Sequence, residues 1–154
     1  MPSATADHAI RALLVLASTP GRRFMRADEI AAATGAPQNY MAKTLNALAR
    51  ARLVSSARGP AGGFSLAVDP GSLTLARIVD LFDAPRLQTR CMLGNAPCNK
   101  QRPCIAHDCW TAVMNARRAP LVATTIADLL PDVVAVAPPG AGAEEIRTTA
   151  TVAA

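Results

Sequence analysis

The spacing of apolar and polar positions over the first fifty residues predicts three helices. Residues 6–18, ADHAIRALLVLAS, place apolar side chains every three or four positions, which is the period of one helix face. A second helix is expected over about 27–34 with Gly35 as its C-cap, and a third over about 37–51 with a proline in its first turn. Only the turn T-G-A-P separates the second helix from the third, and two short helices joined in this way are typical of a helix-turn-helix.

Two short strands after the third helix predict a β-hairpin. They are expected over residues 53–57 and 63–67, and the segment RGPAGG between them supplies the glycine and proline of a tight turn. A β-hairpin directly after a helix-turn-helix forms the wing of a winged helix. No P-loop Lys-Ser/Thr follows these glycines, which argues against a phosphate cradle for a nucleotide.

The second half of the chain predicts further helices around an irregular loop. A helix over about 73–82, capped by Ser72, precedes a polar loop of residues 86–104 that contains cysteine, glycine and proline. Helical periodicity returns over residues 105–130. Pro85 is expected to end the first of these helices, and in the second Pro120 is expected to cause a kink or break and Pro131 to end the helical region. The tail from about Asp132 has no periodicity, and we expect it to be disordered.

The excess of positive charge coincides with the predicted winged helix. The chain has 16 Lys and Arg against 11 Asp and Glu, a net charge of +5. Residues 1–60 hold eight basic and three acidic side chains, whereas residues 61–154 hold eight of each. A basic module of this kind predicts a polyanion as its partner, and the winged helix makes double-stranded DNA the expected one.

Composition narrows the classes of protein further. With 51% hydrophobic and 18% charged residues the chain can bury a core, and its length allows one or two small domains. No apolar run reaches the roughly 18 residues of a membrane span, and Asp7, His8 and Arg11 interrupt any signal-peptide core. We therefore expect a cytoplasmic protein, in which structural disulfides are rare.

Candidate DNA contacts lie in the third predicted helix and in the wing. Gln38 and Asn39 stand at the start of that helix, the part that reaches base edges in a helix-turn-helix. Lys43 supplies a cation for phosphate, and Arg58 on the wing could reach a minor groove or a phosphate. Any one of the basic side chains could serve only to keep the surface soluble, but their combination with the helix-turn-helix and the Gly-rich hairpin favours DNA binding. The full candidate set is Arg26, Gln38, Asn39, Tyr40, Lys43, Arg58, Gly59 and Gly62.

Four cysteines and a histidine fall within 19 residues, at the spacing Cys91-x6-Cys98-x5-Cys104-x2-His107-x-Cys109. Thiolates and an imidazole so placed can hold zinc or an iron–sulfur cluster, and the wide spacers suit the bulkier cluster better. Reversible disulfides between the cysteines remain an alternative. Cys109, beside Trp110 at the start of a helix, is expected to be a buried apolar residue rather than a ligand.

Three segments together resemble the Rrf family of winged-helix transcription regulators, which includes the iron–sulfur cluster assembly regulator and the nitric-oxide-sensitive repressor. They are NYMAKTLNALARARL, LVSSARGPAGGFSLA and the cysteine run followed by Trp110, and the likeness covers about residues 1–130. It implies a homodimer in which the long helix after the cysteine loop pairs with its partner and each winged helix takes half of a near-palindromic operator. The expected fold is mainly α: a winged helix-turn-helix over 1–70, a linker helix, cluster-binding loop and dimerisation helix over 71–130, and a disordered tail over 131–154.

The resemblance also implies an iron–sulfur cluster held by three cysteines and one different ligand. The three cysteines correspond to Cys91, Cys98 and Cys104. For the fourth ligand, His107 matches the histidine of the assembly regulator, which holds a [2Fe-2S] cluster. Asp7 matches the aspartate by which the nitric-oxide sensor completes a [4Fe-4S] cluster from the opposite subunit. This chain has both residues, and Cys109 is a third option, so the cluster type stays open.

Two departures from the family pattern limit what the resemblance implies. The first cysteine gap is six residues where the best-known members have five, which changes the loop length and leaves ligation intact. Ala42 stands where the assembly regulator has a glutamate that discriminates between operators, so that specificity does not carry over.

The expected function is a DNA-binding transcription regulator, in the first place a repressor, gated by a cluster that senses nitric oxide, redox state or iron–sulfur status. Two alternatives stay open. One is a cluster-free thiol redox sensor that also binds DNA. The other is a small metalloenzyme. The sequence argues against this alternative, because it has no second His/Glu group for acid–base chemistry.

Overall fold

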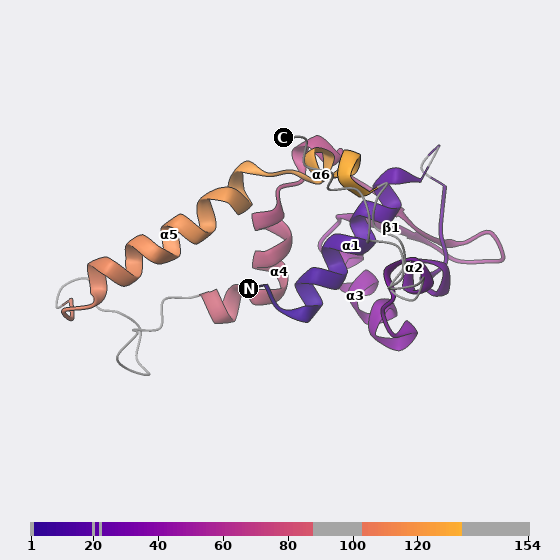
Figure 1. Ribbon diagram of the computed structural model, residues 1–154. Helices are drawn as coiled ribbons and strands as arrows, with labels where there is room; N and C mark the ends of the chain where they lie inside the picture. Colours follow the sequence, from indigo (N-terminus) through magenta and orange to yellow (C-terminus); the bar gives the residue numbers. More distant parts are fainter. Residues whose placement is uncertain (1, 20, 22, 88–102, 134–154) are drawn as a thin grey trace, which may run out of the picture.

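The computed structural model describes residues 2–19, 21, 23–87 and 103–133 (Figure 1). In chain order the elements are α1 (Ala4–Ser18), α2 (Ala27–Thr34), α3 (Gln38–Arg50), β1 (Val54–Ala57), β2 (Gly63–Leu66), the 3-10 helix η2 (Pro70–Ser72), α4 (Leu75–Leu87), α5 (His107–Ala123) and α6 (Ile126–Val133). The mainly α fold with a two-stranded wing, predicted from the sequence, is confirmed.

The central element of the core is α1, which contacts α2, α3, α4 and α6. The helix starts where the hydroxyl of Ser3 accepts a hydrogen bond from the backbone N–H of Ala6, at 3.2 Å. Its inner face carries alanine and leucine, so that neighbouring helices can approach closely. The large side chains that are fully buried are Leu13, Ile30, Met41, Leu45, Leu48, Leu53, Leu73, Ile78 and Ile126. One core therefore joins the winged helix to α6, near the end of the described chain.

The helix-turn-helix forms where the sequence predicts it. Gly35 ends α2 in the left-handed conformation, with φ +68°, and the backbone N–H of Ala36 donates to Ala31 at 3.1 Å. Pro37 directly precedes α3, at a position where a helix needs no backbone N–H donor. At the other end of α2, the side chain of Glu29 accepts from the backbone N–H of Arg26 at 2.7 Å.

The wing is an antiparallel hairpin that also holds the segment before α2. Val54 pairs with Leu66 and Ala57 with Gly63. Met25 and Phe64 exchange two backbone hydrogen bonds, at 2.9 and 2.7 Å, so the segment around Met25 lies against β2.

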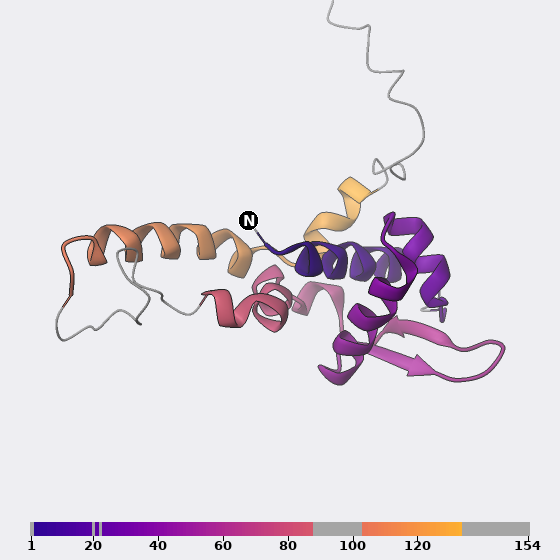
Figure 2. The ribbon, with the colours of Figure 1, turned by 90° about the horizontal axis from the view of Figure 1, so that it is seen from below.

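After the wing, the chain leaves the core through α4 and α5 and returns to it with α6. Both views show α5 projecting from one end of the molecule and the wing from the other (Figures 1 and 2). After α5 the chain turns back, because the backbone of Leu75 donates to Thr124 and that of Ile126 donates to Leu73, each at 2.9 Å. These bonds set α6 against α1.

The predictions that helices end at Pro85 and at Pro131 were wrong, and the break expected at Pro120 comes after Ala123. α4 continues through Pro85, α5 through Pro120 and α6 through Pro131. A proline removes one helical hydrogen bond, and in α5, whose residues are exposed or half-buried, water can satisfy the carbonyl that loses its partner. The predicted cap also differs, because Thr74 rather than Ser72 precedes α4, and its hydroxyl accepts from the N–H of Arg77 at 3.4 Å.

Residues 88–102 of the predicted cysteine loop and 134–154 of the predicted tail lie outside the described residues. At the edges of these predictions, residues 86–87 are helical in α4 and residues 131–133 are helical in α6, so the loop and the tail were predicted to begin too early. In the parts of the chain that the structure describes, no helix has the length and apolar character needed to cross a bilayer.

Candidate nucleic-acid interface and cysteine segment

The outer face of α3 presents a polar stripe. Met41, Leu45 and Leu48 are buried against the core, whereas polar residues of the opposite face are exposed. The stripe consists of Gln38, Asn39, Lys43, Asn46 and Arg50, all exposed. From Asn39 to Arg50 its members are three or four residues apart, which is the spacing of a single helix face, so one groove of DNA could meet them, and Gln38 stands beside them at the start of the helix.

Asn46 belongs to this stripe and was missed by sequence reasoning. It stands three residues after Lys43 and seven after Asn39, and this helical spacing is the signal that could have found it. Asparagine is suited to reading adenine in the major groove.

Tyr40 does not share this exposed face. Its hydroxyl is hydrogen-bonded to Oγ1 of Thr5 in α1, and its ring meets the imidazole of His8 edge-on. The structure therefore directs this predicted DNA contact toward α1.

The tip of the wing is exposed, and its glycines shape the turn. Arg58 and Gly59 are exposed, and Gly59 has φ +108°. The N–H of Gly62 donates to the carbonyl oxygen of Gly59 at 2.9 Å, and a Cβ at Gly62 would lie 2.3 Å from the carbonyl oxygen of Ala57. The glycines thus hold Arg58 at the end of a tight loop.

A basic hollow separates the wing from the start of α2. It has a volume of about 470 Å³ and is lined by Arg23, Phe24, Arg26, Glu29, Pro60, Ala61 and Gly62. Arg26 also pairs with Asp28, at 3.3 Å between Nε and Oδ1, but its side chain remains two-thirds exposed. An exposed guanidinium of this kind can still meet a phosphate.

The structure describes the cysteine segment only from residue 103 onward, so Cys91 and Cys98 lie outside the described residues. The backbone N–H of His107 donates to the carbonyl oxygen of Cys104 at 2.9 Å, where α5 begins. Cys104 is half-buried and Cys109 is exposed. The prediction that Cys109 is a buried apolar residue was wrong, because the first turn of α5 is not packed into the core. Within the described ranges, no three His, Cys, Asp or Glu residues are grouped so that they could hold a metal ion.

Asp7, the other candidate ligand, lies in the first turn of α1. Its carboxylate pairs with Nε of Arg11 at 3.0 Å, and both side chains are about half exposed. In this arrangement the carboxylate remains accessible from outside the subunit.

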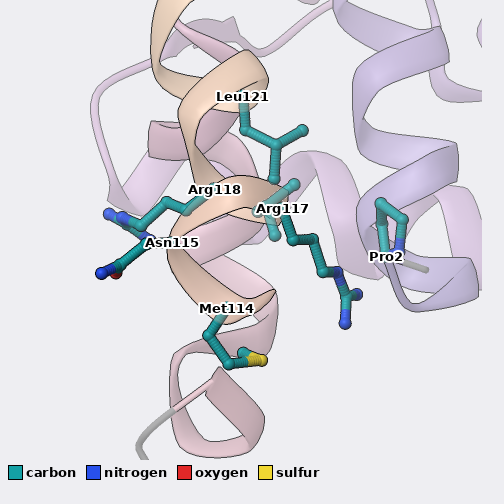
Figure 3. A pocket seen from close by; sticks show the side chains of 7 residues that line it. Pro2, Met114, Asn115, Arg117, Arg118 and Leu121 are labelled. Carbon is teal, nitrogen blue, oxygen red and sulfur yellow. The ribbon is translucent and has the colours of Figure 1, made fainter. Parts of the chain in front are cut away.

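α5 is attached to the rest of the subunit mainly through α4. Arg118 donates two hydrogen bonds to Asp80, at 2.7 and 2.6 Å, and this bidentate pairing lowers the pKa of the Asp80 carboxyl. A cavity of about 280 Å³ lies beside this pair, lined by Pro2, Val79, Met114, Asn115, Arg117, Arg118 and Leu121 (Figure 3). None of the 17 residues of α5 is buried.

Comparison with known sequences agrees with the winged helix. The model of the Rrf2 family, described as an iron-dependent transcriptional regulator, matches residues 3–132. A protein of Aquifex aeolicus described as an HTH-type transcriptional regulator is 33% identical over 130 residues, covering 83% of this chain and 90% of its own. The HTH-type transcriptional regulator IscR of Enterobacter sp. is 29% identical over 103 residues, covering 67% of this chain and 63% of its own.

Solved structures share the fold. CymR, the global cysteine regulator of B. subtilis, superposes with a TM-score of 0.72 at 22% identity, covering 86% of this chain and 97% of its own. IscR of T. potens superposes with a TM-score of 0.68 at 23% identity, covering 89% and 92%. Because the family match spans most of the chain, the protein belongs to the Rrf2 family of DNA-binding transcriptional regulators and is not an enzyme.

Proposed function

We propose that this chain is a homodimeric repressor whose operator binding is controlled by an iron–sulfur cluster. The description of the matching family as iron-dependent supports the proposal. The observation that carries it is the cysteine segment, in which Cys91, Cys98 and Cys104 precede His107 by no more than sixteen residues.

The described end of this segment fits such a ligand set. Cys104 and His107 lie one turn of chain apart and are joined by a backbone hydrogen bond, so a thiol and an imidazole start from neighbouring positions. Thiolates, with histidine in some sites, are the ligands that iron–sulfur clusters use. When bound, the cluster would supply a centre that responds to nitric oxide, oxygen, redox potential or iron supply. Cys91 and Cys98 would complete the set of thiols.

The fourth ligand has two principal candidates. His107 would act from the same turn as Cys104, whereas Asp7 would act from α1 of the partner, with one of its carboxylate oxygens paired with Arg11. UV-visible and resonance Raman spectra of anaerobic protein, measured beside His107→Ala and Asp7→Ala, distinguish them. The substitution that alters the cluster bands identifies the ligand, and Cys109 is implicated if neither does.

The exposure of α5 supports the homodimer. A 17-residue helix without a buried residue is marginally stable in water, and Val113 and Val122 are each about half exposed. Covering these side chains with a second copy of α5 would stabilise both helices. A twofold dimer presents two α3 helices, so we expect a near-palindromic operator of double-stranded DNA.

Anaerobic purification tests the cluster directly. The wild-type protein is expected to be brown and to contain iron and acid-labile sulfide, and Cys98→Ala is expected to lose both and to bind the operator differently. Thr111→Ala, at an exposed position of α5 with no ligand chemistry, is the matched control and should retain the colour. A colourless wild-type preparation that contains zinc would refute the cluster.

A cluster-free thiol sensor is the second candidate, favoured by the exposed Cys109 five residues after Cys104. CymR of Staphylococcus aureus, which shares the fold, has been solved in an oxidised form. If this candidate holds, peroxide would change operator affinity reversibly in metal-free protein, and dithiothreitol would restore it. Persistence of that response in Cys104→Ser with Cys109→Ser would count against the two thiols.

A further inference from the structure

A side-chain contact joins the first turns of α1 and α3. The hydroxyl groups of Tyr40 and Thr5 are hydrogen-bonded, and the Tyr40 and His8 rings lie edge to face, with centroids 5.5 Å apart and planes at 73°. Thr5 and His8 are three residues apart and therefore share one face of α1. We call these three residues the Tyr40 latch.

The latch separates Tyr40 from the residues that face outward in the same turn of α3. Gln38 and Asn39 are exposed, whereas Tyr40 is half-buried and its hydroxyl already has a partner within the protein. To donate to a phosphate while this bond persists, the Tyr40 hydroxyl would have to act as the acceptor from Thr5, so part of its bonding capacity is already used within the protein. The geometry thus favours a role within the protein.

The same turn of α1 carries Asp7 on a different face. Asp7 pairs with Arg11 and is half exposed, while its neighbours Thr5 and His8 point toward α3. Because a helical turn moves as a unit, any displacement of Asp7 that shifts this turn also shifts both contacts of Tyr40.

One polar atom of the Tyr40 latch has no hydrogen-bond partner in the described part of the chain. Among the residues that the structure describes, Nδ1 of His8 is buried without a hydrogen-bond partner. A buried nitrogen without a partner raises the free energy of this arrangement, which lowers the cost of displacing the imidazole. Because the contact joins two helices, a movement of α1 that displaces His8 also acts on Tyr40 of α3.

We propose that Tyr40 is a positioning residue: through Thr5 and His8 it ties the angle of α3 to the first turn of α1, and it does not read DNA. For its regulatory consequence the inference rests on the proposed function, because engagement of the segment near Asp7 by a cluster would then reach the operator through Tyr40.

A double-mutant cycle in cluster-free protein tests the latch without the cluster. Fluorescence anisotropy would compare the affinity for operator DNA of wild type, Tyr40→Phe, Thr5→Val and the double variant. Each single variant removes one hydroxyl and is expected to bind about three- to tenfold more weakly, as the loss of one hydrogen bond allows. The double variant is expected to bind no more weakly than the weaker single variant, because both remove the same contact.

Three controls keep this cycle interpretable. Ser18→Ala removes a hydroxyl of α1 that bonds only within its own helix, to Leu14 and Val15, and should leave affinity unchanged. Thr5→Ser keeps the hydroxyl and should bind as wild type does. Thermal melts establish that every variant is folded at the assay temperature. Weaker binding by Tyr40→Phe with wild-type binding by Thr5→Val would show a direct DNA contact and overturn the proposal. The proposal would also be overturned if the losses of affinity in the two single variants multiplied in the double variant. It would be overturned too if the variants lost thermal stability but kept wild-type affinity for DNA.

A second measurement separates this inference from the proposed function. The ratio of operator affinities between protein reconstituted anaerobically with iron and sulfide and protein left cluster-free is measured for wild type and Tyr40→Phe. The ratio is expected to fall toward one in Tyr40→Phe while the visible spectrum of the cluster is unchanged. A wild-type ratio of one would refute cluster control and leave the hydroxyl cycle as the test of the latch. A large ratio that Tyr40→Phe preserves would refute transmission through Tyr40.

Discussion

Gly63 stands where the wing and the basic segment before α2 come closest. Its φ of +148° is outside the range that residues with a side chain readily adopt, and a Cβ there would lie 2.3 Å from the carbonyl oxygen of Met25 and 2.6 Å from its carbonyl carbon. Both atoms belong to the backbone, so no side chain can move aside. We therefore predict that Gly63→Ala separates the Met25 segment from β2.

The size of the effect follows from two contributions. Forcing alanine into this backbone conformation costs about 1–3 kcal/mol. Losing the two hydrogen bonds between Met25 and Phe64 costs about 0.5–1.5 kcal/mol each, so the free energy of unfolding should fall by about 2–6 kcal/mol in total. A loss of this size is a large part of the 5–15 kcal/mol that is typical of natural proteins.

Gly59→Ala is the matched control for this prediction. Gly59 also has a positive φ, +108°, but no atom lies within 4 Å of the position of its Cβ. It therefore carries the backbone strain without the clash. Urea denaturation at one fixed protein concentration should give Gly63→Ala the lower midpoint, with operator affinity reduced as Arg23 and Arg26 lose their support. Equal midpoints for the two variants would refute the reasoning from the close approach.

Three further predictions concern other parts of the molecule. The pairing with Arg118 lowers the pKa of Asp80, so its stabilisation is present above the unfolded-state pKa of about 3.9 and is lost as pH falls through the folded-state value. Asp80→Asn should therefore be less stable than wild type at pH 6 by about 0.2–1 kcal/mol, and the difference should shrink as the pH falls below the unfolded-state pKa. Asn46→Ala should weaken operator binding without changing its salt dependence, whereas Lys43→Ala should lower the slope of log affinity against log salt by about one, both in anisotropy titrations. Val113→Asp should shift the protein from dimer to monomer in analytical ultracentrifugation, and an unchanged mass would refute pairing through α5.

Local signals were sufficient to predict the winged helix. The turn between α2 and α3 depends on Gly35 in the left-handed conformation and on Pro37 before α3, and the wing on a glycine-rich turn. Each of these acts over a few residues, so the sequence alone contains what is needed to place them.

Features that depend on packing between distant segments were not predictable in the same way. The sequence places Tyr40 beside Gln38 and Asn39 and so groups it with the DNA contacts, but the position of Thr5, 35 residues earlier, determines where its side chain goes. Likewise, Cys109 beside Trp110 suggests burial only if α5 packs against a core, and in the described chain this helix does not.

The distribution of charge suggested a basic DNA-binding module joined to a neutral sensor. The hydrophobic core, however, is not divided at the boundary between these two parts of the chain. Ile126 of α6 is buried in the same cluster as Leu13 of α1, and the chain reaches it through backbone bonds between Leu73 and Ile126 and between Leu75 and Thr124. α1 is thus packed against the recognition helix on one side and against the returning end of the chain on another, and it carries Asp7 on an exposed face. A signal received near α5 or Asp7 therefore need not cross a linker to reach α3. It has only to shift α1, whose first turn already contacts the recognition helix through Tyr40.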